Sequence, residues 1–192
     1  MIRRALAALF WRVTGYRLQA EPYPEPPAVI VAAPHTSNWD FAFFLAILWS
    51  LRMRVRFLAK HTLFRGFAGS VLRALGGVPV DRRDPAGLVD DLIRRFQAGE
   101  RFYLVITPEG TRSAAKGWKS GFYRIARETG LPVVTGYVDK VTRTAGVGPT
   151  IELTGDVRAD MDKFRAFFGP KKGLRPEFTS VPHLAAEDEP EG

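Results

Sequence analysis

A histidine and an aspartate five residues apart are the residues of this chain best suited to acid–base chemistry. His35 and Asp40 lie in the stretch Ala32-Ala-Pro-His-Thr-Ser-Asn-Trp-Asp-Phe41. A carboxylate beside an imidazole can hold one tautomer of the ring and stabilise its protonated form, so that the ring can take a proton from a hydroxyl group. The spacing alone is a weak signal, because His183 and Asp188 share it in an acidic stretch near the end of the chain.

The residues around the first pair predict a loop at the end of a buried strand. Residues 28–33 form a short, apolar, β-branched run, which is typical of such a strand. An apolar helix is expected over residues 41–51, with Ser37 or Asn38 as its N-cap. His35 would then lie at the carboxyl end of a strand, where open α/β sheets usually place their sites. A loop is needed there, since five residues along one helix would point the two side chains apart.

A second polar motif follows another strand-like run. Residues 102–107 predict a buried strand, and Pro108-Glu-Gly-Thr-Arg-Ser113 comes directly after it. Glu109 can accept hydrogen bonds from the hydroxyl groups of a substrate. Gly110 allows a close approach of backbone to a ligand, and Arg112 offers a planar fork for a phosphate or carboxylate. The motif therefore predicts either a ligand-binding turn or a simple polar turn.

Basic side chains are expected near both motifs. The stretch Gly76-Gly-Val-Pro-Val-Asp-Arg-Arg83 places Arg82 and Arg83 at the end of a short strand. Three lysines lie in neighbouring loops, namely Lys60, Lys116 and Lys119. Several cations gathered at strand ends near a glutamate favour a pocket for a polar headgroup.

The composition indicates a folded basic protein without cysteine chemistry. Hydrophobic residues make up 46% and charged residues 25% of the 192 residues, which suits one domain. Cysteine is absent, which excludes disulfides, thiolate nucleophiles and cysteine-based zinc sites. Four of the 20 acidic residues lie beyond His183, so residues 1–183 hold 28 basic and 16 acidic residues, a net charge of +12. Such a charge attracts phospholipid surfaces, nucleic acid or phosphorylated small molecules.

The amino-terminal residues predict a short amphipathic helix. Its apolar residues recur at helical spacing, namely Ile2, Leu6, Leu9, Val13 and Tyr16. The seven apolar residues between Arg4 and Arg12 are far fewer than the roughly 20 that span a bilayer. Arg12 and the lack of a small-residue cleavage site argue against a signal peptide. Two interpretations remain: a helix packed on the domain's own core, and a basic helix lying in a membrane interface. We expect residues 1–20 to associate with a membrane.

Strand and helix patterns alternate along the rest of the chain. Strands are expected at residues 28–33, 55–58, 78–80, 102–107, 133–138 and 150–154. Helices are expected at residues 41–51, 64–75, 85–98, 120–129 and 159–168, with Asp84 as an N-cap and Gly99 and Gly130 as stops. This alternation predicts a single α/β domain over residues 21–183, with a mostly parallel sheet flanked by helices. Residues 139–149 predict a loop, and residues 184–192 a disordered acidic tail.

Taken together, these motifs resemble the glycerophospholipid acyltransferases, typified by the 1-acyl-glycerol-3-phosphate acyltransferases. The H-x4-D box of that family is similar to His35–Asp40, and its P-E-G-T-R-S block matches residues 108–113 without a change. Its other two blocks resemble Gly77–Arg82 and Leu131–Val134. Lys60 resembles a basic position that often precedes the second block. The four blocks occur in order, and their combination is far more specific than any one of them.

The resemblance implies transfer of a fatty acyl group from a thioester, acyl-CoA or acyl-carrier protein, to the hydroxyl of a lysophospholipid such as 1-acyl-glycerol-3-phosphate. His35 would be the general base and Asp40 its orienting carboxylate, and neither a metal nor a further cofactor is expected. The resemblance also implies a set of acceptor-binding residues, namely Lys60, Arg82, Glu109, Gly110, Thr111 and Arg112. It implies a glycerolipid O-acyltransferase of phospholipid biosynthesis, cytoplasmic and peripheral on the inner face of the cell membrane.

Other interpretations of the sequence remain open. Thr107 stands where the family commonly has Phe, and residues 78–80 lack the usual aromatic residue, so an amino-acid-based lysolipid or a glycolipid are alternative acceptors. The stretch Ser113-Ala-Ala-Lys116 matches the S-x-x-K of some serine hydrolases, but their S-D-N and K-T-G partners are missing. A non-catalytic basic protein that binds membranes or nucleic acid is a further alternative. No nucleic-acid module is recognisable, and no nucleic-acid partner is expected.

Overall fold

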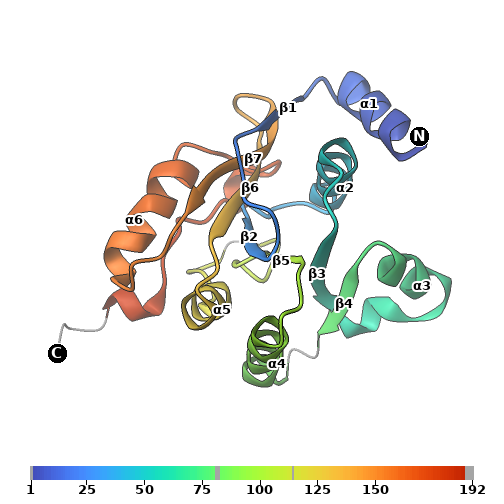
Figure 1. Cartoon of the computed structure of the whole chain (residues 1–192). Helices are drawn as coiled ribbons and strands as arrows, with labels where there is room; N and C mark the ends of the chain where they lie inside the picture. Colours follow the sequence, from blue (N-terminus) through green and yellow to red (C-terminus); the bar gives the residue numbers. More distant parts are fainter. Residues whose placement is uncertain (1, 81–82, 114, 189–192) are drawn as a thin grey trace.

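A seven-stranded, mostly parallel sheet flanked by helices forms the centre of a single α/β domain, as the sequence predicts (Figure 1). The computed structural model describes residues 2–80, 83–113 and 115–188. The strands are β1 (Arg17–Ala20), β2 (Ala28–Ala32), β3 (Val55–Lys60), β4 (Gly77–Val80), β5 (Tyr103–Ile106), β6 (Val133–Asp139) and β7 (Thr144–Ile151). Their order across the sheet is β1-β7-β6-β2-β5-β3-β4.

The central strands are parallel and deeply buried. β2 pairs in parallel with both β5 and β6, and its residues Ala28–Val31 are all buried. A strand with helices on both faces has no solvent side, which is why β2 and β5 are unbroken apolar runs rather than alternating ones. Only β7 and its parallel neighbour β1 run against the other five strands. The carboxyl ends of the neighbouring strands β2 and β5 therefore lie side by side.

The helices divide between the two faces of the sheet. They are α1 (Ile2–Thr14), α2 (Asp40–Leu51), α3 (Gly66–Ala74), α4 (Pro85–Gln97), α5 (Gly121–Thr129) and α6 (Val157–Phe168), with short 3-10 helices η1 (His61–Phe64), η2 (Pro176–Phe178) and η3 (Ala185–Asp188). Apolar residues of α4, α5 and α6 form one core cluster, and those of α2 form the other with α1 packed beside them. Figure 1 shows α3 next to β4 at the sheet edge, and its Leu72 packs against the α2 cluster.

Helix caps explain several boundaries. Asp84 accepts a hydrogen bond from the Gly87 backbone N–H at 2.9 Å, which confirms it as the N-cap of α4. Gly130 ends α5 in the left-handed region, also as expected. The prediction for α2 was wrong: the residue before the helix is Trp39, and no side chain caps it. The helix begins with Asp40 itself, and the Asp40 carboxylate accepts hydrogen bonds from backbone N–H groups of the preceding loop.

The structure corrects the sequence prediction at the β1 side of the sheet. β1 was not predicted, and residues 139–149, expected as a loop, largely belong to β7. Glycines obscured the strand pattern of β7. One of them, Gly146, has a φ of 154°, and a side chain there would collide with the backbone of Gln19 in β1. The close pairing of β1 with β7 therefore requires a residue that sequence patterns associate with loops.

The described residues near both ends of the chain pack against the domain. Helix α1 packs on α2 through Ala7, Phe10 and Trp11, and the Trp11 indole donates to Ser50 Oγ at 3.0 Å. The prediction of disorder from residue 184 is wrong up to Asp188, because Leu184 and Glu187 are buried. Arg165 Nη1 lies 2.7 Å from a Glu187 carboxylate oxygen. Residues 189–192 lie outside the described residues.

Candidate active site

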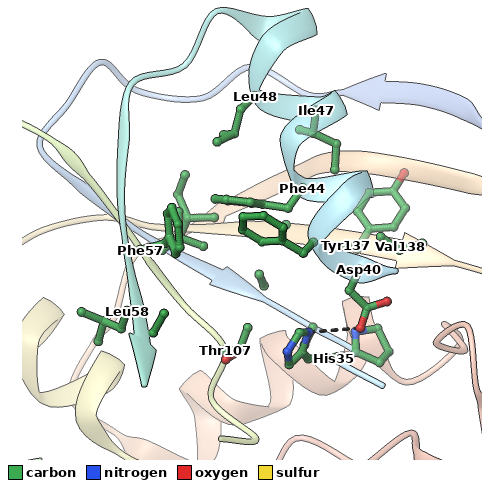
Figure 2. A pocket seen from close by; sticks show the side chains of 18 of the residues that line it. His35, Asp40, Phe44, Ile47, Leu48, Phe57, Leu58, Thr107, Tyr137 and Val138 are labelled. Atoms are coloured by element: carbon green, nitrogen blue, oxygen red, sulfur yellow. Dashed lines mark ion pairs between the residues drawn. The ribbon is translucent and has the colours of Figure 1, made fainter. Parts of the chain in front are cut away.

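The loop between β2 and α2 brings His35 and Asp40 into contact. His35 Nδ1 lies 3.1 Å from Asp40 Oδ2 (Figure 2). The ring is partly exposed, whereas the carboxylate is buried. Because Nδ1 is engaged with the carboxylate, the other ring nitrogen, Nε2, is the one available to a substrate. The pair has the arrangement of a histidine general base whose tautomer is held by an aspartate carboxylate.

Asp40 is held by the loop that it orients. Its Oδ2 atom accepts hydrogen bonds from the backbone N–H groups of Thr36 and Ser37, both at 2.8 Å, in addition to the contact with His35. The N-terminal end of α2 also favours a negative charge at this position. All of these hydrogen-bonding contacts involve Oδ2, and they fix the orientation of the carboxylate. The carboxylate therefore acts as a rigid orienting group for the imidazole.

Glu109 ties the second motif to the first. Its Oε2 accepts a hydrogen bond from the His35 backbone N–H at 2.7 Å, and Oε1 accepts one from the Ser180 hydroxyl at 3.1 Å. Burial raises the pKa of Glu109 to about 7, against the opposing effect of the hydrogen bonds from His35 and Ser180. Both oxygens are thus occupied by protein donors, where the sequence suggested contact with substrate hydroxyls. In this structure Glu109 positions the His35 loop.

The remaining residues of the second motif shape the turn after β5. Gly110 has a φ of 65°, a left-handed backbone conformation that favours glycine. Thr111 Oγ1 lies 2.8 Å from Ser113 Oγ, which ties the turn to itself. Arg112 lines the same cavity as His35, and so does Thr107. Arg112 and His35 thus share one cavity, and a role of Arg112 in binding the acceptor stays a prediction.

Lys60, a predicted binding residue, does not join this group. Lys60 ends β3 and precedes η1, where its side chain is exposed and does not line the cavity. Arg82 lies outside the described residues. The structure therefore places Lys60 away from the polar lining of the cavity, and the predicted role of Arg82 stays a prediction.

A cavity of about 420 Å³ runs from the His35–Asp40 pair between α2 and the sheet. Its polar lining comprises side chains of His35, Asn38, Asp40, Thr107 and Arg112. Figure 2 shows His35, Asp40 and Thr107 at one end. The rest is apolar: Figure 2 shows Phe44 and Phe57 in the middle and Ile47 and Leu48 at the end away from His35. The shape and polarity suit a long hydrocarbon chain with its reactive end at the histidine.

Sequence analysis missed residues 173–180, an irregular segment that contacts both motifs. Ser180 donates to Glu109, and the Arg175 backbone N–H donates to Thr36 Oγ1 at 3.0 Å. Thr36 is buried, and Gly173 packs so closely against it that a side chain there would collide. No pattern in the sequence marks this segment, because it is irregular and acts through single hydroxyl and backbone groups.

The second histidine–aspartate pair has the same spacing but a different setting. His183 Nε2 lies 3.1 Å from Asp188 Oδ2, and His183 Nδ1 lies 3.3 Å from a Glu187 carboxylate oxygen. Both ring nitrogens face carboxylates, so neither is free for a substrate. The pair does not line the cavity of His35. These contacts hold residues 183–188 together, and the Trp118 backbone N–H donates a hydrogen bond to the His183 carbonyl.

Comparison with known proteins identifies the family of this chain. Residues 16–139 match the acyltransferase family, so the chain belongs to that family and is an acyltransferase. This range includes both motifs and six of the seven strands in whole or in part. Among curated proteins, none has a sequence that matches this chain.

A comparison with solved structures finds the same fold. One of the structures found is the crystal structure of the 1-acyl-sn-glycerophosphate (LPA) acyltransferase, PlsC, from Thermotoga maritima, with a TM-score of 0.61 and 16% sequence identity. The match covers 86% of this chain and 74% of that one. At this identity the likeness concerns the fold.

Proposed function

We propose that this protein transfers a fatty acyl group from a thioester to the free hydroxyl of a lysophospholipid such as 1-acyl-glycerol-3-phosphate. The observation that carries the proposal is the contact of His35 with Asp40 at the polar end of a long apolar cavity. A hydrolase of the serine type would need a nucleophile beside the histidine. No serine is among the described residues that line the cavity, whereas the cavity offers a base and room for a lipid.

In the proposed reaction His35 Nε2 takes the proton of the acceptor hydroxyl as its oxygen attacks the thioester carbonyl carbon. The C–S bond of the tetrahedral intermediate then breaks, and the departing sulfur receives the proton from the imidazolium. General base assistance of this kind typically contributes about 10²–10⁴-fold. Asp40 stabilises the positive charge on the ring between the two proton transfers. The acyl group passes directly from sulfur to oxygen.

The cavity supports separate places for the acyl chain and the headgroup. The apolar stretch past Phe44 and Phe57 suits a fatty acyl chain, and Arg112 in the polar lining can bind a phosphate. An acceptor phosphate bound by Arg112 would share the cavity with His35. The thioester carrier is a cosubstrate, acyl-CoA or acyl-carrier protein. No other cofactor enters the proposed reaction.

Peripheral membrane binding through α1 belongs to the same proposal. Helix α1 packs on α2 with one side and leaves an apolar stripe exposed, namely Ile2, Leu6, Leu9 and Val13. Both expected interpretations are therefore compatible, since different sides of the helix serve each. Within the described residues, no helix combines the length and apolar character that crossing a bilayer requires. An exposed stripe next to arginines suits the inner face of a cell membrane.

Product identification by mass spectrometry tests the proposed reaction. Purified protein is given palmitoyl-CoA or palmitoyl-acyl-carrier protein with lysophosphatidate, other lysophospholipids, an amino-acid-based lysolipid or a glycolipid. We expect free thiol and phosphatidate in equal amounts, and little thiol without an acceptor. Equal thiol release with and without acceptor would identify a thioesterase and refute the proposal.

A further inference from the structure

The segment from η1 through α3 exposes three apolar side chains on one side. Leu63 is 53% exposed, Phe67 86% and Val71 41%. They are spaced four residues apart, and we call them the η1–α3 surface. Helix α3 has little contact with the core: Gly69 is its one buried residue, and Leu72 packs partly against the α2 layer. An almost fully exposed phenylalanine at the centre of such a surface indicates a binding partner.

The charge around this surface is entirely positive in sequence. Residues 41–80 contain six lysines and arginines and no aspartate or glutamate. Lys60 and Arg65 are exposed at the starts of η1 and α3. Arg73 is held at the end of α3, where it donates to the Phe64 carbonyl at 3.3 Å and lies over the Phe64 ring. Two exposed cations, Lys60 and Arg65, thus lie next to Leu63 and Phe67 along the chain.

We propose that the η1–α3 surface is a second membrane contact, which inserts Phe67 into the interface of a bilayer that carries anionic lipids. In such an interface the apolar side chains can contact the lipid acyl chains while the neighbouring basic side chains contact the anionic headgroups. The surface is separate from α1, since α3 lies beside β4 at the edge of the sheet (Figure 1). Its binding does not depend on the proposed acyl transfer.

The surface also adjoins the lipid cavity. Leu63 is exposed and at the same time lines that cavity, and Leu72 on the inner side of α3 lines it too. The wall of the cavity thus reaches the η1–α3 surface. When this surface rests on a bilayer, a hydrocarbon chain can pass between bilayer and cavity with little exposure to water.

Vesicle sedimentation with the full chain and no substrate tests the proposal. Binding is measured to vesicles of phosphatidylcholine alone and of phosphatidylcholine with phosphatidylglycerol. Phe67→Ser is expected to weaken binding to both by about tenfold, because a large apolar group no longer leaves water. Arg65→Gln is expected to reduce the gain from phosphatidylglycerol. Val181→Ser is the control, since Val181 is 67% exposed but lies outside this surface.

The outcomes separate the partner classes. Unchanged vesicle binding of Phe67→Ser overturns the proposal, and so does an equal loss in Val181→Ser. If Phe67→Ser binds vesicles normally but loses binding to acyl-carrier protein, the surface is a protein-docking site and the membrane proposal is wrong. Urea unfolding confirms that each variant is folded, and a midpoint equal to that of the parent is expected because all three side chains are exposed.

Discussion

Replacing Asp40 by asparagine removes the charge that faces the imidazole while keeping the size of the side chain. The His35 Nδ1–Asp40 Oδ2 distance of 3.1 Å gives the charged pair an interaction of about 5 kcal/mol at an effective dielectric constant of about 20. An amide oxygen in the same place still accepts a hydrogen bond from a charged donor, which recovers about 1.5–3 kcal/mol. The net loss of about 2–4 kcal/mol in the transition state corresponds to a fall in kcat/KM of about 30- to 1000-fold.

The stability of this variant needs a separate measurement. Asp40 Oδ1 is buried and has no hydrogen-bond partner among the described residues, so the amide group of the Asp40→Asn variant would place an unpaired donor there. A loss of about 1–3 kcal/mol of unfolding free energy is expected from that group. Urea unfolding measures it, and the kinetic comparison is made at a temperature where both proteins are folded.

The chain supplies a matched control for the kinetics. Asp188→Asn changes a second aspartate at the same spacing from a histidine, with a 3.1 Å contact of its own, outside the cavity. Thiol release from palmitoyl-CoA in the presence of lysophosphatidate is the assay, and Asp188→Asn should leave it within twofold of the parent. A folded Asp40→Asn protein that retains kcat/KM within threefold would refute the role of the carboxylate.

Four further predictions follow from the same contacts. Glu109 has a folded pKa raised to about 7 from an ordinary 4.5, so its contribution to stability is present below about pH 4.5 and is lost as the pH rises through 7, by about 3 kcal/mol in total. Glu109→Gln should therefore gain stability relative to the parent between pH 5 and 8 in urea unfolding, and a constant difference across that range would contradict the reasoning. Ser180→Ala removes one hydrogen bond to Glu109 and should lower the unfolding free energy by about 1 kcal/mol with a smaller loss of kcat than Asp40→Asn, whereas a loss of kcat as large as that of Asp40→Asn would show a direct role. Leu48→Phe fills the end of the cavity away from His35 and should shift the preferred acyl chain of the CoA substrate to a shorter length, as competition between acyl-CoAs measures; an unchanged preference would place the chain elsewhere. Leu9→Ser on the exposed stripe of α1 should weaken vesicle sedimentation about tenfold, and undiminished binding would count against α1 as a membrane contact.

The sequence predicted the central sheet well because its strands are simple in composition. β2 and β5 are apolar runs with a polar motif directly after each, so strand, loop and candidate residues could be located together. Their adjacency is a matter of tertiary pairing, which strand patterns do not encode. The structure supplies it through the parallel register of β2 with β5, which brings the His35 and Glu109 loops to one edge.

The parts that were missed depend on exceptions to local rules. β7 contains two glycines that a strand normally disfavours: β1 approaches closely at Gly146, and the Phe167 ring approaches closely at Gly148. The role of Glu109 depends on its burial, and its hydroxyl partner, Ser180, lies 71 residues away in an irregular segment. Neither property leaves a periodic pattern. The second histidine–aspartate pair shows the converse, since it has the same spacing but does not line the cavity of His35.

The most direct test of the account compares His35→Ala with His183→Ala in acceptor-dependent thiol release, with phosphatidate identified by mass spectrometry. His35→Ala should be folded by urea unfolding and should form phosphatidate at least about 100-fold more slowly, because the base is gone. His183→Ala should form phosphatidate at nearly the parent rate. Equal rates for a folded His35→Ala protein and the parent would show that the histidine at the cavity is not the base, and the proposed mechanism would be wrong.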